Sequence, residues 1–270
     1  MSNYKIGWFS TGRGEGSKGL LQAMQDSIRS GEIDAEFSFV FCSRESGETE
    51  ATDQFLKMVE GYHIPLITCS YRKFKSGRPD MASDGVLEPW RLDYDREVMK
   101  RLQDFHPDLC VLAGYMLIVG KEMCRKYDMI NLHPASPWGP AGTWQQVIWQ
   151  LIESDAVETG VMMHLATPEL DMGPPVTYCT FSIRGKPFDK YWQEIKGHPL
   201  EEIKKKQGEN NNLFKAIREY GFVRELPMVT TTVKAFSTGK VSITPGKKVA
   251  DAVGNIIDVY NLTDEIDRQV

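Results

Sequence analysis

The sequence predicts an α/β protein: a Rossmann-like, mostly parallel sheet with flanking helices, followed by a longer C-terminal extension of helices and a β-hairpin. Two observations carry this prediction. Short apolar runs alternate with segments of helical spacing, and such alternation is typical of parallel strands joined by crossover helices. The most apolar run, residues 109–119, has a first half that fits a central strand covered on both faces.

The first half of the chain supplies most of the expected sheet. Each expected strand is a short apolar run bounded by glycine, proline or polar residues. Residues 73–89 are polar, contain several glycines and prolines, and are expected to form a surface excursion. Strands are expected at residues 5–11, 35–43, 64–69, 109–113 and 129–132, and helices from Leu20 onward and at residues 49–61 and 94–105.

The second half continues the alternation and then becomes mainly helical. Thr143 is a good N-cap for the helix that follows it. We expect residues 1–183 to form the catalytic domain and residues 184–270 an extension packed on the same domain. The expected elements are helices at residues 144–154, 213–220 and 226–236, a charged helical segment at 188–212, strands at 157–167 and 175–183, and a hairpin of 241–244 with 255–260.

Composition excludes several classes of protein. The chain has 270 residues and a formal charge of −5, so it lacks the excess of basic residues that binding to nucleic acid requires. No stretch approaches the apolar length of a membrane span, and the first residues lack a signal-peptide pattern. The five cysteines are odd in number and form no Cys-x-x-Cys pair. We therefore expect reduced thiols, no metal site and a cytoplasmic protein, with a homodimer left open.

Residues 129–137 are the first place to look for chemistry. Asn131 and His133 lie two apart where a strand must end, because Pro134 cannot continue a central ladder. An amide can hold a developing oxyanion, and an imidazole can move a proton at neutral pH. Asp171, in a Gly/Pro-rich segment, offers a carboxylate that could orient His133. The plainer alternative is a histidine bonded to backbone, and a metal hydrolase using His133, His164 and Asp171 is a weaker one.

A glycine-rich turn, residues 12–19, follows the first expected strand. Glycines let backbone N–H groups approach an anion, and the start of a helix favours negative charge. The spacing is neither the dinucleotide fingerprint nor Walker A, since Lys18 precedes Gly19 and not Ser or Thr. A monophosphate group is favoured over a connection that binds nothing.

Taken together, these segments resemble the folate-dependent formyltransferases. The resemblance rests first on Asn131-x-His133-Pro134, followed by Glu-Leu-Asp171-x-Gly-Pro. Further similar segments are residues 14–18, 91–97, 112–118 and 159–164. The similarity runs from about Lys5 to about Val176. It implies the formyltransferase fold and transfer of a formyl group from 10-formyltetrahydrofolate to an amine.

The resemblance also implies roles for individual residues. Asn131 would hold the formyl oxygen, His133 would assist proton movement, and Asp171 would orient His133. The acceptor would be an amine on a phosphorylated ribose (glycinamide ribonucleotide), as in purine biosynthesis. The remaining implied residues are Gly16, Ser17, Lys18 and His164 for the acceptor, and Arg91, Leu112, Met116, Leu117 and Ile118 for the folate.

The chain departs from the family pattern at two of these positions. Lys18 stands where the family usually has Asn, and Leu117 where it usually has Arg. Both changes bear on the acceptor and the folate contacts more than on the chemistry. Alternatives left open are a formyltransferase for an amino sugar or for methionyl-tRNA, a formyl-folate hydrolase, and a phosphate-binding module without turnover.

Overall fold

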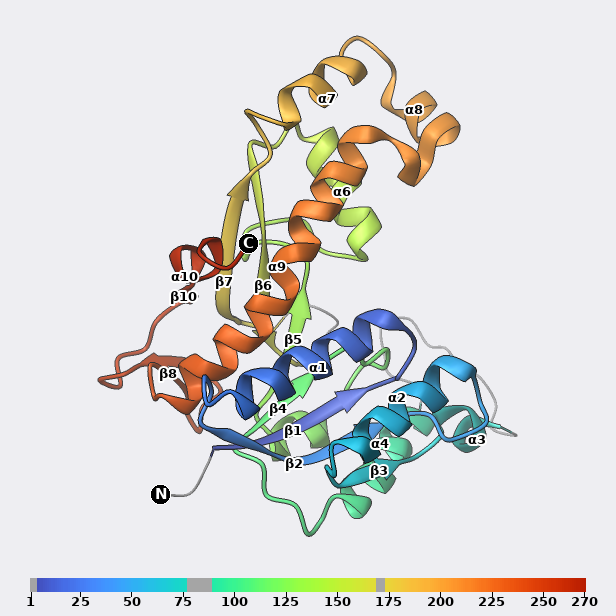
Figure 1. The fold of residues 1–270 in the computed structure, drawn as a ribbon, viewed down its shortest axis with the longest axis vertical. Helices are drawn as coiled ribbons and strands as arrows, with labels where there is room; N and C mark the ends of the chain where they lie inside the picture. The colour runs from blue at the N-terminus through green and yellow to red at the C-terminus, as the bar shows by residue number, and fades with distance from the viewer. Residues whose placement is uncertain (1–3, 77–88, 169–172) are drawn as a thin grey trace. The chain divides into compact units, whose positions relative to one another are not determined.

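The computed structural model describes residues 4–76, 89–168 and 173–270 (Figure 1). By contact, the chain divides into two compact units. Unit 1 comprises residues 1–131, 164–174 and 233–257, and unit 2 comprises residues 132–163, 175–232 and 258–270. Strands β5 (Met129–His133) and β6 (Glu158–Leu165) each contribute residues to both units.

Unit 1 contains a parallel sheet. Its strands are hydrogen-bonded in the order β5-β4-β1-β2-β3, and every neighbouring pair is parallel. The expected strands of the first half of the chain are therefore confirmed, with β3 and β4 shorter than expected. Apart from β5, these strands are β1 (Tyr4–Ser10), β2 (Ala35–Cys42), β3 (Leu66–Thr68) and β4 (Leu109–Leu112).

Helices connect these strands, and two of them begin earlier than the sequence predicts. Helix α1 (Glu15–Arg29) already includes most of the glycine-rich segment, and α4 (Pro89–Arg101) begins at Pro89. Proline is well suited to the first helical position, because the N–H it lacks would have no partner there. Helix α2 (Glu50–Gly61) is capped by Thr49, whose side chain accepts from the Thr52 amide at 3.2 Å. The others are α3 (Tyr71–Lys75) and α5 (Lys121–Lys126).

Aromatic side chains fill the core beneath this sheet. Phe9 packs edge-on against Phe39, with ring centroids 5.5 Å apart, and against Tyr115 at 5.8 Å. All three are buried. Edge-to-face packing of this kind adds to the stabilisation from apolar burial, so it fixes the segment after β4, which contains Tyr115, against β1.

Unit 1 also contains a small antiparallel pair, β8 (Val241–Ile243) with β9 (Val249–Asp251). The prediction that residues 241–244 form a hairpin with residues 255–260 was wrong. The turn at Pro245-Gly246 returns the chain at once, and the Thr244 amide donates to the Lys248 carbonyl at 2.9 Å. Of residues 255–260, Ile256 makes only an isolated bridge to Ala250.

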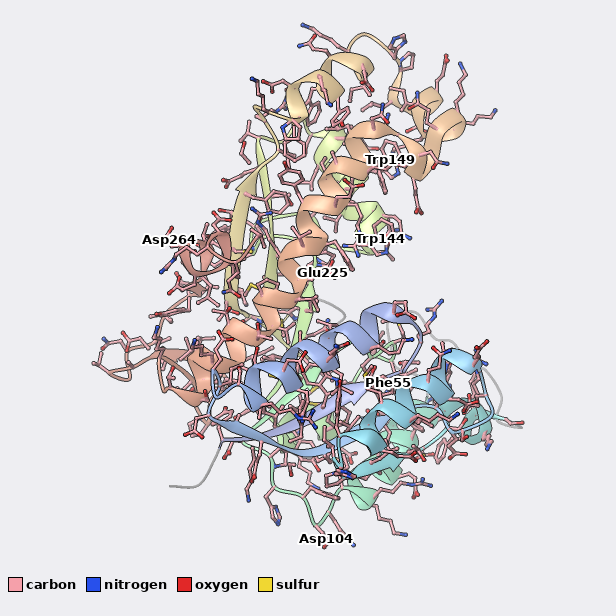
Figure 2. All side chains as sticks on the ribbon, in the orientation of Figure 1. Phe55, Asp104, Trp144, Trp149, Glu225 and Asp264 are labelled. Carbon is pink, nitrogen blue, oxygen red and sulfur yellow. The ribbon has the colours of Figure 1, made fainter. Side chains whose placement is uncertain are left out.

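Unit 2 combines strands with longer helices. Its strands are hydrogen-bonded in the order β10-β7-β6, where β7 is Pro175–Ser182 and β10 is Tyr260–Asn261. Trp144 and Trp149 lie on α6 (Trp144–Glu153) (Figure 2). Their rings pack on Phe214, with centroids 5.9 and 5.1 Å away. The other helices are α7 (Phe188–Ile195), α8 (Leu200–Gln207), the 3-10 turn Gly208–Asn210, α9 (Asn212–Ser237) and α10 (Thr263–Asp267).

Helix α9 replaces the two helices predicted at residues 213–220 and 226–236. It runs through Pro227 without a break in its assignment. Proline removes one backbone donor from a helix interior. Buried Met228 and Val229 directly after it anchor the following turn, so tertiary packing outweighs this local penalty. Among the described helices, none is both long and apolar enough to cross a membrane.

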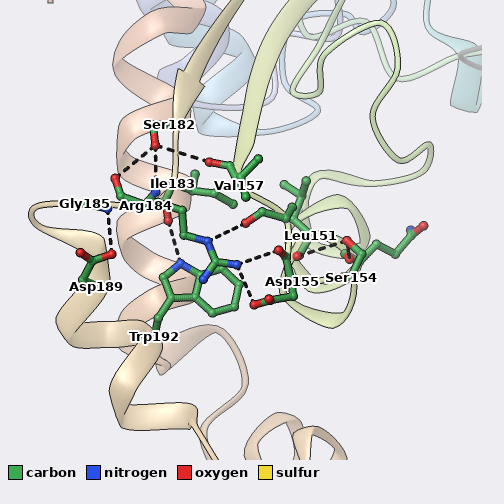
Figure 3. A network of polar contacts seen from close by, with 12 residues as sticks. Leu151, Ser154, Asp155, Val157, Ser182, Ile183, Arg184, Gly185, Asp189 and Trp192 are labelled. Atoms are coloured by element: carbon green, nitrogen blue, oxygen red, sulfur yellow. Dashed lines mark hydrogen bonds and ion pairs between the residues drawn. The ribbon is translucent and has the colours of Figure 1, made fainter.

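Arg184 ties the end of β7 to the loop after α6 within unit 2 (Figure 3). Its Nη2 donates to the Asp155 carbonyl at 2.7 Å, and its Nε donates to the Ala156 carbonyl at 3.1 Å. The guanidinium also lies 3.8 Å from the centroid of the Trp192 ring, whose Nε1 donates to the Ile183 carbonyl at 2.7 Å. One side chain thus joins three segments of this unit.

Replacing Arg184 with Met should therefore destabilise the protein while leaving its length and apolar stem in place. We expect a loss of about 1–2 kcal/mol, because charge-assisted hydrogen bonds and a cation–π contact disappear together. Urea unfolding followed by circular dichroism measures the change. Arg125→Met, at an exposed position of α5, is the control and should stay within about 0.5 kcal/mol of the parent. Equal stability of the two variants would contradict this account.

Candidate active site

Asn131 and His164 come together in unit 1. Asn131 lies near the end of β5, His164 lies near the end of β6, and Asn131 Nδ2 is 3.3 Å from His164 Nε2. His164 Nδ1 lies 2.9 Å from the Leu165 carbonyl oxygen. A carbonyl only accepts, so Nδ1 carries a hydrogen and Nε2 can accept from the Asn131 amide. The histidine thereby orients a carboxamide at the carboxyl end of a parallel strand.

Of the other two predicted catalytic residues, the structure describes only His133. His133 is the last residue of β5, belongs to unit 2 and is buried. Asp171 lies outside the described residues, so its relation to His133 stays a prediction. Among the residues that the structure describes, no group of three or more His, Cys, Asp or Glu side chains could hold a metal ion.

The predicted phosphate residues form the first turn of α1. Gly16, Ser17 and Lys18 are helical, and only Ser17 is buried. Lys18 Nζ is 2.6 Å from Glu15 Oε1 and donates to Gln54 Oε1 at 2.8 Å. Its charge is therefore already partly compensated within the protein. The backbone N–H groups of this first turn are the donors that a helix leaves for an anion.

The segment after β4 lies directly beside this turn. The Thr11 amide donates to the Gly114 carbonyl at 3.0 Å, and the Met116 amide donates to Thr11 Oγ1 at 2.9 Å. Gly114 has φ +68, and a Cβ there would lie 2.7 Å from Ser17 Oγ. Residues expected to bind the acceptor and residues expected to bind the folate therefore share one edge of the unit 1 sheet.

This close approach yields a prediction with a matched control. Gly114→Ala should lower the free energy of unfolding by about 1–2 kcal/mol, because alanine disfavours a left-handed backbone, and should raise the KM for the acceptor several-fold by displacing Ser17. Gly31→Ala carries the same backbone penalty, with φ +77, but a Cβ there meets nothing within 4 Å. Chemical unfolding and steady-state kinetics compare the two variants. An unchanged KM in Gly114→Ala would contradict the role given to Ser17.

Arg91 contacts a neighbouring segment of the same unit. It is buried, pairs with Asp95 Oδ1 at 2.9 Å and donates to the Ile118 carbonyl at 2.5 Å. Asp95 Oδ2 accepts from the Gly120 amide at 2.6 Å. Burial raises the pKa of Asp95, and the Arg91 charge opposes that rise. Arg91 and Asp95 thus hold the segment after β4 in place, and a contact between Arg91 and a ligand stays a prediction.

The residues predicted to line the folate slot differ in their exposure. Leu112 is buried at the end of β4, and Leu117 is partly buried and packs against the aromatic core of unit 1. Met116 is 56% exposed. Only part of the predicted apolar surface is therefore exposed, and Leu112 and Leu117 pack within unit 1.

The sequence analysis missed a pocket in unit 1. Its volume is about 470 Å³, and it lies beside the ends of β1 and β2. The residues that line it include Arg13, Arg44, Tyr71, Arg72 and Met116. The signal was present, because Arg13 and Arg44 each follow a strand at the edge where ligands of open α/β sheets bind.

Comparisons with known proteins identify the family of this chain. The formyl transferase family model matches residues 12–185. Phosphoribosylglycinamide formyltransferase of Saccharomyces cerevisiae is 28% identical over 174 residues, which is 60% of this chain and 76% of the yeast protein. The Escherichia coli enzyme of the same name is 33% identical over 85 residues, 31% of this chain and 39% of its own length.

A solved structure gives the same result for the fold. Phosphoribosylglycinamide formyltransferase from Coxiella burnetii superposes with a TM-score of 0.68 at 19% identity, covering 96% of this chain and 99% of that one. At that identity the likeness concerns the fold alone, whereas the family match spans more than half of the chain. The chain belongs to the formyl transferase family, as a folate-dependent enzyme whose formyl donor is 10-formyltetrahydrofolate.

Proposed function

We propose that this protein transfers the formyl group of 10-formyltetrahydrofolate to the amine of glycinamide ribonucleotide, a step of purine biosynthesis. The observation that carries the proposal is the Asn131–His164 hydrogen bond of 3.3 Å. It holds a carboxamide donor at the strand end where formyl transfer needs an oxyanion site. The acceptor is suggested by the names of the relatives, the phosphoribosylglycinamide formyltransferases of Saccharomyces cerevisiae and Escherichia coli.

In the proposed reaction, the acceptor amine attacks the formyl carbon and the carbonyl oxygen becomes an oxyanion. Asn131 donates to that oxyanion, and His164 keeps its amide oriented. The carbon–nitrogen bond to the folate then breaks, and the proton lost by the amine is delivered to the departing folate nitrogen. His133 moves this proton, with Asp171 orienting its ring. The products are the formylated amine and tetrahydrofolate.

Formyl transfer measured directly tests the proposal. Purified protein is incubated with 10-formyltetrahydrofolate and glycinamide ribonucleotide, and formylated product is followed by mass spectrometry. A second incubation without the amine measures release of formate. Formylated ribonucleotide supports the proposal, and formate released at the same rate without amine indicates a hydrolase. A formylated amino sugar in place of the ribonucleotide would keep the chemistry and change the acceptor.

The proposal also includes the cellular compartment and the partners of the enzyme. All five cysteines are free thiols, which fits a reducing compartment, and we infer a cytoplasmic enzyme. Its partners are then small molecules, with no role for nucleic acid, and a homodimer is left open. Size-exclusion chromatography with light scattering measures the oligomeric state.

A further inference from the structure

The pocket of about 470 Å³ in unit 1 is unusually rich in positive charge. Arg13 follows β1, Arg44 follows β2, and Arg72 lies in α3. The lining also includes Thr11, Thr49 and Tyr71, each of which has a hydroxyl group. Its volume falls within the range of small-molecule sites. None of Gly16, Ser17 and Lys18 is among its lining residues, so it is separate from the first turn of α1.

Arg44 is the strongest sign that this pocket is built for an anion. Arg44 is only 6% exposed, and its Nη1 donates a long hydrogen bond of 3.5 Å to Thr49 Oγ1. Its Nε has no hydrogen-bond partner among the residues that the structure describes. Burying a guanidinium is unfavourable unless a negative group compensates it. An anion in the pocket would supply that group.

Neither of the two acidic residues that follow Arg44 in the sequence neutralises it. Glu45 Oε2 pairs with Lys73 Nζ at 2.7 Å. Glu48 Oε1 accepts from the Glu45 amide at 2.8 Å. Its other oxygen, Oε2, is buried and has no hydrogen-bond partner within the described part of the chain. Glu48 therefore makes no charge-assisted bond to Arg44, and the positive charge of this wall of the pocket persists.

Arg72, which also lines the pocket, adds more positive charge. Arg72 Nε donates to the Tyr71 hydroxyl at 3.3 Å. This bond lowers the pKa of Tyr71, and Arg44 contributes to the same shift. Arg13 is exposed and pairs with no acidic side chain of a described residue. Lys18, in contrast, already has Glu15 and Gln54 as partners.

We propose that this pocket binds a diphosphate group. Arginine forks bind phosphate oxygens in pairs, and each guanidinium can serve a different phosphoryl group. A single phosphate offers at most two negative charges to three guanidiniums, whereas a diphosphate offers more charge and a longer row of oxygens. The site is argued from its own residues and is independent of which amine the enzyme formylates.

Inorganic pyrophosphate is the probe for this site, with orthophosphate as the comparison. Isothermal titration calorimetry on the full chain, at fixed ionic strength and without folate or amine, measures both affinities. We expect pyrophosphate to bind at least about tenfold more tightly than orthophosphate. Equal affinities would overturn the assignment of a diphosphate, and no detectable binding of pyrophosphate would overturn the site. Formyl-transfer activity plays no part in either outcome.

Matched substitutions locate the binding. Arg44→Gln and Arg72→Gln should each weaken pyrophosphate binding at least about tenfold. Arg96→Gln is the control, because Arg96 is exposed on α4 and pairs with Glu122 and Asp93 away from the pocket lining. Arg72 is also exposed, so its variant keeps the test valid if Arg44→Gln fails to fold. Unchanged affinity in Arg72→Gln, or equal loss in Arg96→Gln, would overturn the proposal.

ADP, as a third probe, tests whether the diphosphate binds as part of a nucleoside diphosphate. ADP presents the same group attached to a nucleoside, and the exposed Met116 side chain offers apolar surface at the pocket. Binding of ADP more tightly than pyrophosphate, with the same loss in Arg72→Gln, supports a nucleoside diphosphate. Equal binding supports recognition of the diphosphate alone. Binding of ADP that Arg72→Gln leaves unchanged would overturn the proposed location.

Discussion

Asn131→Ala is expected to reduce kcat for formyl transfer by about a hundred- to a thousandfold. The reason is that removal of one preorganised oxyanion donor typically has an effect of this size. In the proposed mechanism the donor is the Asn131 amide, whose nitrogen lies 3.3 Å from His164 Nε2. Because the lost bond forms in the transition state, kcat should fall much more than the KM of either substrate rises.

Steady-state rates with both substrates varied separate kcat from KM for this variant. Asn131 lies within β5 and is half-buried, so circular dichroism and thermal unfolding must show that the fold is retained. Asn210→Ala, in the exposed 3-10 turn of unit 2, is the control and should keep parent activity. A folded Asn131→Ala variant with turnover within threefold of the parent would remove the oxyanion role.

The strands were predictable because their sequence patterns are local. Each of β1, β2 and β5 is a short apolar run with clear boundaries, and burial on both faces of a parallel sheet demands such runs. The helices were less predictable where local and tertiary preferences disagree. Two helices were predicted at residues 213–220 and 226–236, yet α9 is continuous from Asn212 to Ser237, and buried residues such as Met228 and Val229 pack its middle.

In the candidate site too, local features were predictable from the sequence, whereas features that depend on tertiary packing were not. The sequence placed Asn131 and His133 at a strand end, since their spacing and Pro134 are visible locally. The partnership of Asn131 with His164, 33 positions away, follows from the pairing of segments distant in the chain. The burial of Arg44 and Arg91 could not be read from spacing at all. Both guanidiniums lie in positions that only the packed tertiary structure defines.

His133→Ala should lower turnover by at least about a hundredfold, since a positioned proton-transfer group contributes about that much or more. His133→Gln tests the same role more sharply. Glutamine is polar and can hydrogen-bond, but it cannot carry a proton between the amine and the folate nitrogen. If His133 moves protons, both variants should lose turnover to a similar extent. If it only holds a hydrogen bond, the Gln variant should recover most of the activity.

Burial makes the second variant necessary. His133 is 4% exposed in unit 2, so alanine would leave a void whose effect on stability could imitate a loss of chemistry. Glutamine fills most of that space, and its rate can be compared at equal thermal stability. His198→Gln, exposed after α7, controls for the substitution itself. Near-parent turnover in a folded His133→Gln variant would assign the proton transfer to another group.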